Sequence, residues 1–281
     1  MTEHQEAMLR LLDEVDRICR KYNIKYMLFA GTLLGAVRHQ GFIPWDDDLD
    51  VVMLRTEYEK FLAAAKDKID DNVFFLQPEF SSHWPMQFSK LRLQGTAAIE
   101  KYHPKDKLVH QGIYIDVFPC DNLSNNKLVQ RAQFIASKIV IAKCLYRRGY
   151  ETDSLIKKLI IQLCRPLPLK PFLSLTRLDG HNQTQKVHCF LGAAHRYEKS
   201  TFKREWLTAT IDAPFEGSTY PISVYYDQLL TQLYGDYMTP LSEEQRACKV
   251  HAVIVDVHNS YERYLDQQAN MKITIYTRSI R

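Results

Sequence analysis

The sequence predicts an α+β (α/β) fold, in which helices flank a mixed sheet and an additional, mostly helical lobe follows. Strand and helix patterns alternate up to residue 122, whereas helical periodicity and a basic, proline-punctuated stretch dominate the next part of the chain. With 281 residues the chain can bury a sizeable core. We therefore expect a sheet core over residues 1–122, a helical insert over 123–200 and a return segment over 201–281 that packs on the core.

The individual elements follow from hydrophobic spacing together with capping and turn residues. Capping boxes at Thr2–Gln5 and Thr56–Glu59 mark two helix starts. Pro119 is expected to stop the strand before it, and Gly235 to end the last helix. In chain order we expect a helix over 2–22, a strand over 24–30, a short helix over 33–37, a strand over 49–53, a helix over 58–68, strands over 73–76, 87–93 and 112–118, a helix over 125–148, strand and turn signals over 197–221 and a helix over 223–234.

Composition limits the class of function and the compartment. The formal net charge is only +4, so charge does not indicate a sequence-independent grip on DNA or RNA, and no nucleic-acid partner is expected. The six cysteines form no Cys-x-x-Cys pair, which favours reduced thiols over a disulfide framework or a zinc ribbon. The first residues have no signal-peptide pattern, and no spanning apolar run follows. We expect a cytoplasmic protein.

An acidic cluster, Asp46-Asp47-Asp48-Leu49-Asp50, precedes a hydrophobic strand pattern. Successive strand side chains point to opposite faces, so Asp48 and Asp50 are expected to share a face while Leu49 turns into the core. Two carboxylates this close repel unless a cation neutralises them, and Mg²⁺ is typically held by one or two carboxylates plus substrate phosphates. We predict a metal site at Asp48 and Asp50, with Asp46 and Asp47 in the entering loop. A solvated turn is the alternative for an isolated Asp-x-Asp.

Asp116 is the predicted third carboxylate of this site. It alternates with Ile115 and Val117 on an expected central strand. A carboxylate buried there without a partner would be costly, so a bound cation is the simplest reason for its presence.

The turn after the first strand is a candidate phosphate site. Gly31 lets the backbone approach a phosphate closely, and the following helix offers N–H groups and the positive end of its dipole. Thr32 can donate a hydroxyl, and Arg38 can pair with phosphate as a planar fork. An ordinary helix start and a surface cation are the alternatives for these residues.

The segments Gly31–Arg38 and Gly41–Asp50 together resemble the signature of the LicD and fukutin family. This likeness covers residues 7–120 well and 215–245 more loosely. Further segments similar to that family are Lys90-Leu-Arg92, Gly112–Pro119 and Tyr234–Pro240.

The resemblance implies a nucleotidyltransferase-like catalytic core, and transfer of a phosphorylated alcohol from a CDP-linked donor to a sugar hydroxyl of a surface glycan. Bacterial LicD proteins use CDP-choline and attach phosphocholine to teichoic acid or lipopolysaccharide sugars, whereas fukutin relatives use CDP-ribitol. For this chain it implies a phosphotransferase with a lipid-linked glycan acceptor. It also implies Mg²⁺, or Mn²⁺ in its place, on Asp48, Asp50 and Asp116.

In that mechanism the acceptor hydroxyl attacks the distal phosphorus in line and CMP leaves. Asp116 is expected to act also as base toward the hydroxyl. The donor phosphates are expected to contact Gly31, Thr32, Arg38, Lys90 and Arg92.

Two weaker signals concern the cargo and the membrane. Choline requires an aromatic cage, for which Trp45, Trp84 and Tyr114 are candidates, with core packing as the alternative role. The stretch 155–175 mixes lysine and arginine with aliphatic residues, as in a segment that lies on the inner face of the cell membrane, although a core helix would show the same pattern.

Other functions stay open at this point. The cargo could be ribitol or glycerol phosphate, and an Asp-x-Asp glycosyltransferase using Mn²⁺ is a second enzyme class. A glycan-binding scaffold descended from such an enzyme is the non-catalytic alternative. His188, Cys189 and His195 suggest zinc only weakly, because their spacing is irregular.

Overall fold

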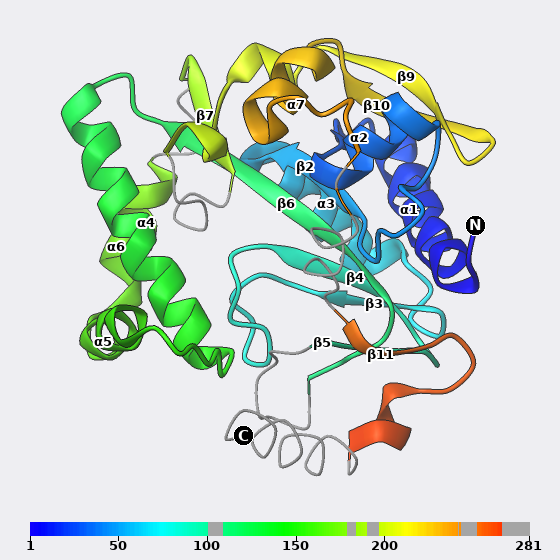
Figure 1. Ribbon diagram of the computed structural model, residues 1–281, viewed down its shortest axis with the longest axis horizontal. Coiled ribbons are helices and arrows are strands. Elements are labelled where there is room, and N and C mark those ends of the chain that lie inside the picture. The colour runs from blue at the N-terminus through cyan, green and yellow to red at the C-terminus, as the bar shows by residue number, and fades with distance from the viewer. Residues whose placement is uncertain (101–108, 179–183, 190–196, 241, 243–251, 266–281) are drawn as a thin grey trace.

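The computed structural model describes residues 1–100, 109–178, 184–189, 197–240, 242 and 252–265. A mixed sheet occupies its centre, and helices flank this sheet, which confirms the α+β class (Figure 1). In chain order the elements are α1 (Glu3–Lys21), β1 (Met27–Leu28), α2 (Ala30–His39), β2 (Asp50–Leu54), α3 (Arg55–Lys68), β3 (Phe74–Gln77), β4 (Ser89–Leu93), β5 (Ala97–Glu100), β6 (Tyr114–Leu123), α4 (Lys127–Arg147), α5 (Leu155–Cys164), α6 (Leu169–Arg177), β7 (Lys186–Cys189), η1 (Tyr197–Ser200), β8 (Thr201–Lys203), η2 (Arg204–Leu207), β9 (Thr210–Phe215), β10 (Ser218–Ser223), α7 (Tyr226–Tyr234), β11 (Ala252–Asp256) and η3 (Tyr261–Tyr264).

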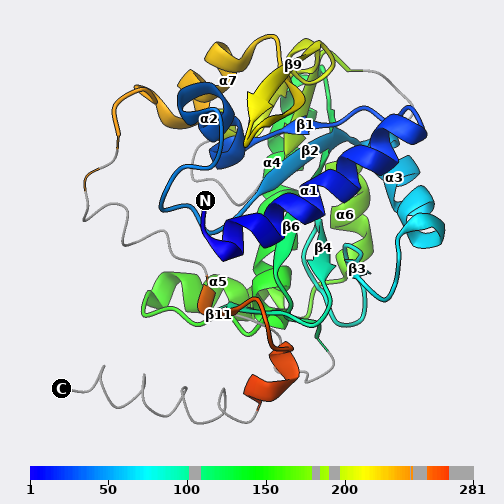
Figure 2. The ribbon, with the colours of Figure 1, turned by 90° about the vertical axis from the view of Figure 1, so that its right-hand side faces the viewer.

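Strand β6 is the centre of the sheet, whose strand order is β1-β2-β6-β4-β3. On one side β2 runs parallel to β6, and this register sets Asp50 opposite Asp116. On the other side β6 pairs in the antiparallel sense with β4 and, further along, with β7. Figure 1 places α1, α2 and α3 on one side of β6 and α4, α5 and α6 on the other; in Figure 2 the first group lies in front of the second.

Helix α1 begins as predicted. The Thr2 hydroxyl accepts a hydrogen bond from the Gln5 backbone N–H, and the Gln5 side chain accepts one from the Thr2 N–H, so the capping box is complete. The apolar face of the helix is fully buried in the main core through Met8, Leu11, Leu12, Val15 and Ile18.

The predicted capping box at Thr56–Glu59 is wrong. Helix α3 begins at Arg55 directly after β2, and no side chain caps its first turn. Because no loop separates strand from helix, Thr56 already lies inside the first turn. The predicted strand over 24–30 is likewise limited to Met27–Leu28, since the chain turns at Ala30, where φ is +46°, and enters α2.

Pro119 does not stop its strand, contrary to expectation. β6 continues to Leu123, and Pro119 lies beside Met53 of β2. The Asp116 N–H donates to Leu49 on the β2 side, so alternation directs the nitrogen of Pro119 to the opposite side. On that side β4 pairs only up to Val117, and β7 pairs only from Cys120. The missing N–H of proline therefore removes no ladder hydrogen bond.

Helices α4 and α6 pack together around a second apolar cluster that contains Trp84 and Phe88. Helix α7 ends at Gly235, where φ is +79°, as predicted from the glycine. None of the helices in the described part of the chain is long and apolar enough to cross a bilayer. Five cysteines, Cys19, Cys120, Cys144, Cys164 and Cys189, are buried free thiols, and Cys248 lies outside the described residues.

Candidate active site

Two carboxylates face each other at the start of the parallel strand pair. Asp50 is the first residue of β2, and its register partner Asp116 lies on β6. Asp48 lies in the loop before β2 instead of on the strand, because the ladder begins only at Asp50. Its charge nevertheless acts on both strand carboxylates, so the three predicted residues share one site.

The electrostatics of this site favour a cation. Burial raises the pKa of Asp50 well above its ordinary value, and the charges of Asp48, Asp116 and Asp46 raise it further. Burial also raises the pKa of Asp116, against the opposing effect of Lys90. Like charges withdrawn from water resist ionisation, so a divalent cation would relieve both burial and mutual repulsion.

Three neighbouring acids of the loop before β2 have oxygens close enough together for one ion, and this group shares only Asp48 with the predicted ligands. Asp46, Asp47 and Asp48 each offer an oxygen, and these atoms lie within 4.8 Å of one another. Mg²⁺ binds oxygen ligands at about 2.0–2.1 Å, so small side-chain adjustments bring such oxygens onto one ion. The Asp47 carboxylate also accepts the Ala252 backbone N–H at 3.3 Å.

The loop that carries these acids is held by the β9–β10 hairpin. Glu216 lies in the turn of this hairpin, and its carboxylate accepts the Phe42 N–H at 2.8 Å. The Glu216 N–H donates to the Gln40 carbonyl oxygen at 3.0 Å. A segment distant in sequence thus fixes where the acidic loop starts.

Gly31 and Thr32 lie beside the acids at the N-terminus of α2. A Cβ on Gly31 would lie 2.8 Å from the Asp46 carboxylate, so a larger residue would push this acid away. The buried Thr32 hydroxyl accepts the Asp50 backbone N–H at 2.8 Å. Thr32 therefore orients the start of β2, a role that the sequence did not suggest.

Replacing Thr32 by Val should destabilise the fold by about 1–3 kcal/mol, because the buried Asp50 N–H loses its acceptor. Urea unfolding measures this difference. Thr32→Ser is the control, since it keeps the hydroxyl and should recover most of the loss. Equal stability of the valine and serine variants would show that this hydrogen bond contributes nothing.

The Arg38 side chain points to the segment that follows α7. Its guanidinium donates to the Tyr237 carbonyl oxygen at 2.6 Å. Three residues earlier, Tyr234 ends α7 with its hydroxyl toward the acids. Tyr234 as a whole residue is 39% exposed, yet the pKa of its hydroxyl is raised by burial of the hydroxyl and by the charges of Asp50, Asp46 and Asp48.

Sequence reasoning missed Tyr234 as a site residue. In the sequence its segment is only similar to a family motif, and nothing local distinguishes a tyrosine at a helix end from a packing residue. The signal that identifies it is long-range, namely the nearness of its hydroxyl to Asp46, Asp48 and Asp50.

Lys90 joins the site from β4. It is almost completely buried, and its ammonium lies 2.8 Å from Asp116 Oδ1 as an ion pair without hydrogen-bond geometry. Burial lowers the pKa of Lys90, while the neighbouring Asp116 and Glu100 raise it. The ammonium also lies 3.1 Å from the centre of the Tyr114 ring.

Arg92 is fully buried on β4, where burial lowers its pKa against the opposing charges of Glu100 and Asp116. Its guanidinium donates to the Gln77 side chain at 2.7 Å and to the Gly112 carbonyl at 2.8 Å, and it faces Glu100 at 3.6 Å. The structure thus places Lys90 in the site and directs Arg92 to the network around Glu100.

The aromatic candidates for a choline cage are largely occupied by the protein's own cations. Lys90 and Arg92 lie over Tyr114, and Lys90, Arg92 and Arg148 lie within 5.8 Å of the Trp84 ring centre. Trp45 is half-buried and packs edge-on against His39. Of the weak zinc candidates, His188 donates its Nε2–H to the Thr176 carbonyl oxygen at 2.7 Å, and His195 lies outside the described residues.

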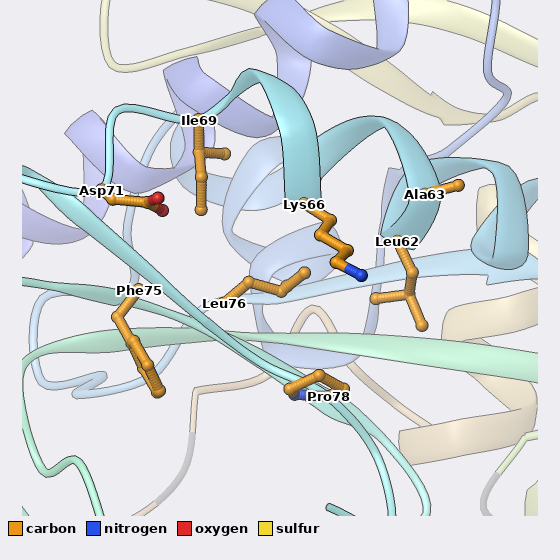
Figure 3. Close-up of a pocket in the computed structure, with 8 residues that line it drawn as sticks. All are labelled: Leu62, Ala63, Lys66, Ile69, Asp71, Phe75, Leu76 and Pro78. Carbon is orange, nitrogen blue, oxygen red and sulfur yellow. The ribbon is translucent and has the colours of Figure 1, made fainter.

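A separate hollow of about 590 Å³ lies between α3 and β3. Figure 3 shows Leu62, Lys66, Ile69 and Leu76 around it. Its lining is mainly apolar and includes none of the acids described above, so it does not form part of the site.

Residues 23–143 match the family model described as LicD/FKTN/FKRP, nucleotidyltransferase domain. This range contains the acidic loop, β2, β4 and β6, which together supply the three carboxylates and Lys90. An α+β sheet with this site and this domain match defines an enzyme of the phosphotransferase class.

The similarity to known proteins extends beyond that domain. The chain is 29% identical to the lipopolysaccharide cholinephosphotransferase LicD of Haemophilus influenzae over 262 residues, which are 88% of this chain and 94% of that protein. It is 33% identical to an uncharacterized protein of Rickettsia typhi over 129 residues, 43% of this chain and 37% of that protein. The chain is thus similar to the LicD/fukutin family through the domain over residues 23–143, and to LicD itself over most of its length.

Proposed function

We propose that this enzyme transfers phosphocholine from CDP-choline to a sugar hydroxyl of a lipopolysaccharide-type glycan precursor and releases CMP. The observation that carries the proposal is the convergence of Asp48, Asp50 and Asp116 in a chain similar over most of its length to a lipopolysaccharide cholinephosphotransferase. A teichoic acid sugar is the alternative acceptor of the same chemistry.

The proposed metal is Mg²⁺, held by Asp48, Asp50 and Asp116 with Asp46 adjacent. Such an ion would neutralise charge on the donor diphosphate and on the departing CMP. Asp116 accepts the proton of the acceptor hydroxyl. At the same time the hydroxyl oxygen forms a bond to the distal phosphorus, and the bond between that phosphorus and CMP breaks. Burial raises the pKa of Asp116, which strengthens it as a base, and the Lys90 ion pair limits that rise.

Backbone groups of this chain contribute to donor binding in the proposal. The N-terminus of α2 at Gly31 offers N–H groups and a positive dipole end next to the acids, where a diphosphate would lie. Tyr234 approaches from α7 and can donate its hydroxyl to the same region. Arg38 positions this segment through the Tyr237 carbonyl.

The function is tested by CMP release from CDP-choline with Mg²⁺ and a lipopolysaccharide acceptor. CDP-ribitol and CDP-glycerol are tested in a second arm of the experiment. This arm is needed because cations of the protein already occupy the ring faces of Trp84 and Tyr114, so these two rings offer no free cage for choline. Release from CDP-choline alone among the donors supports the proposal. Release only from CDP-ribitol or CDP-glycerol would show a different cargo at the same site, and no release from any donor would refute it.

Tyr234→Phe should lower kcat about tenfold to a hundredfold with little change in KM, because a hydroxyl donor at the reacting phosphates is lost while the ring remains. Steady-state CMP release gives both constants. Tyr237→Phe is the matched control, since that hydroxyl donates to Asp227 at an exposed position. An unchanged kcat in Tyr234→Phe would exclude the hydroxyl from the reaction.

A further inference from the structure

Helix α5 exposes its apolar residues instead of burying them. Leu155, Ile156, Leu159, Ile160 and Leu163 are between 47% and 79% exposed. At 100° per residue these five side chains occupy one continuous face of the helix. None of them belongs to either core cluster of the described residues.

The neighbouring helix shows that this exposure is specific to α5. On α6, Leu169, Phe172 and Leu173 pack against the cluster that contains Trp84. Both helices come from the same basic and aliphatic stretch of sequence, yet only α6 uses its apolar face within the fold. The core-helix alternative for this stretch thus holds for α6 and fails for α5.

Helix α5 is held firmly despite its exposure. The Ser154 hydroxyl caps its N-terminus by accepting the Lys157 N–H at 3.4 Å. At the other end the Lys143 ammonium of α4 donates to the carbonyl oxygens of Cys164 and Arg165, at 3.3 and 2.8 Å. The fold therefore presents the apolar face as a formed helix, with no folding required before a partner binds.

The charge around this face identifies the partner. From Ser154 to Leu178 the sequence contains no aspartate or glutamate. The basic residues Lys157, Lys158 and Arg165 are exposed on or next to α5. The charged residues within and directly after the helix are cations, while the exposed acids Glu151 and Asp153 lie in the turn before its N-terminus. A face of leucine and isoleucine flanked along the helix by cations complements a surface that is apolar inside and anionic outside, which describes an acidic phospholipid bilayer.

The length of α5 determines its orientation relative to a membrane. Its ten residues extend about 15 Å, whereas a spanning helix needs roughly 20 residues. A short helix with one apolar face lies in the plane of the interface, with its apolar side among the acyl chains. The proline-rich exit after Cys164 turns the chain back toward α6 and the sheet.

We infer that α5 docks the enzyme on an anionic membrane surface, inserting its exposed leucines and isoleucines while Lys157, Lys158 and Arg165 contact lipid phosphates. The inference goes beyond the proposed function and does not depend on its cargo or acceptor. If the acceptor is lipid-linked, the same surface brings the active site to it.

Co-sedimentation of the full chain with vesicles tests this. The parent should bind phosphatidylcholine vesicles containing phosphatidylglycerol, at least roughly tenfold more tightly than pure phosphatidylcholine vesicles, and added salt should weaken the binding. The triple variant Ile156→Gln, Leu159→Gln, Leu163→Gln should bind at least roughly a hundredfold more weakly. Ile211→Gln with Val253→Gln is the control, because these residues are similarly exposed on β9 and β11 and should leave binding unchanged.

Thermal unfolding and a donor-only CMP release assay keep the outcomes distinguishable. The triple variant should match the parent in both, since its side chains contact no core cluster. Lys157→Gln with Lys158→Gln should lose the preference for phosphatidylglycerol. Absence of parent binding at low salt, or equal binding by parent and triple variant, would overturn the inference. Self-association that the triple variant abolishes, without vesicle binding, would assign α5 to a protein interface instead.

Discussion

Asp50→Asn should lower CMP release at least about a thousandfold while leaving the metal-free protein as stable as the parent or more stable. Asparagine keeps the size of the side chain and removes a carboxylate whose pKa is raised by burial and by Asp48, Asp116 and Asp46. The substitution removes a buried charge that is unfavourable for folding. A loss of activity therefore cannot be explained by a weakened fold. Opposite changes in activity and stability are the mark of a functional acid.

The measurements for Asp50→Asn are the rate of CMP release, Mg²⁺ binding by titration calorimetry, and thermal unfolding in chelator. Asp67→Asn is the control, because Asp67 is an exposed aspartate on α3 that lies outside the acidic loop. Its activity loss should be much smaller. Activity of Asp50→Asn within about tenfold of the parent would place the metal elsewhere.

Glu100→Gln should destabilise the protein by about 3–5 kcal/mol, the largest stability effect that we expect from one side chain. Glu100 is buried between three cations: Arg148 at 2.6 Å, Lys90 at 3.5 Å and Arg92 at 3.6 Å. Without its charge these cations lose their shared partner while Trp84 and Tyr114 keep them away from water. Lys90 keeps its ion pair with Asp116.

The effect should depend on pH with a defined sign. Burial alone would raise the pKa of Glu100, but Lys90, Arg148 and Arg92 outweigh burial and lower it to about 2. A folded-state pKa below the unfolded value of about 4.3 means that the stabilisation is complete above that value and is lost as the pH falls toward 2. Urea unfolding should therefore show the parent approaching Glu100→Gln as the pH falls below about 4.3.

Glu59→Gln, at an exposed position on α3, is the control for this change and should alter stability by less than about 0.5 kcal/mol. A Glu100→Gln variant as stable as this control would show that the three cations find other partners. Lower CMP release with unchanged stability would instead give Glu100 a direct part in the reaction.

Much of the local structure could be predicted because it depends on neighbours in sequence. The Thr2–Gln5 capping box and the glycine at the end of α7 need only a few residues, and both are observed. Leu49 and Val51 are buried beside Asp50 as the alternation predicts. The prediction failed at Pro119 because proline is tolerated only where the partner strand is missing, and no local pattern shows where β4 ends and β7 begins.

The acidic motif, the α+β class and the family resemblance could be predicted from the sequence alone, because each depends on patterns of residues that are neighbours in the sequence. Only the tertiary structure set Asp116 beside Asp50, since that contact requires the parallel register of β2 and β6. It also directed Arg38 to Tyr237, brought Tyr234 to the acids and turned the apolar face of α5 outward. Side-chain chemistry is local, whereas burial and partners depend on segments tens or hundreds of residues away.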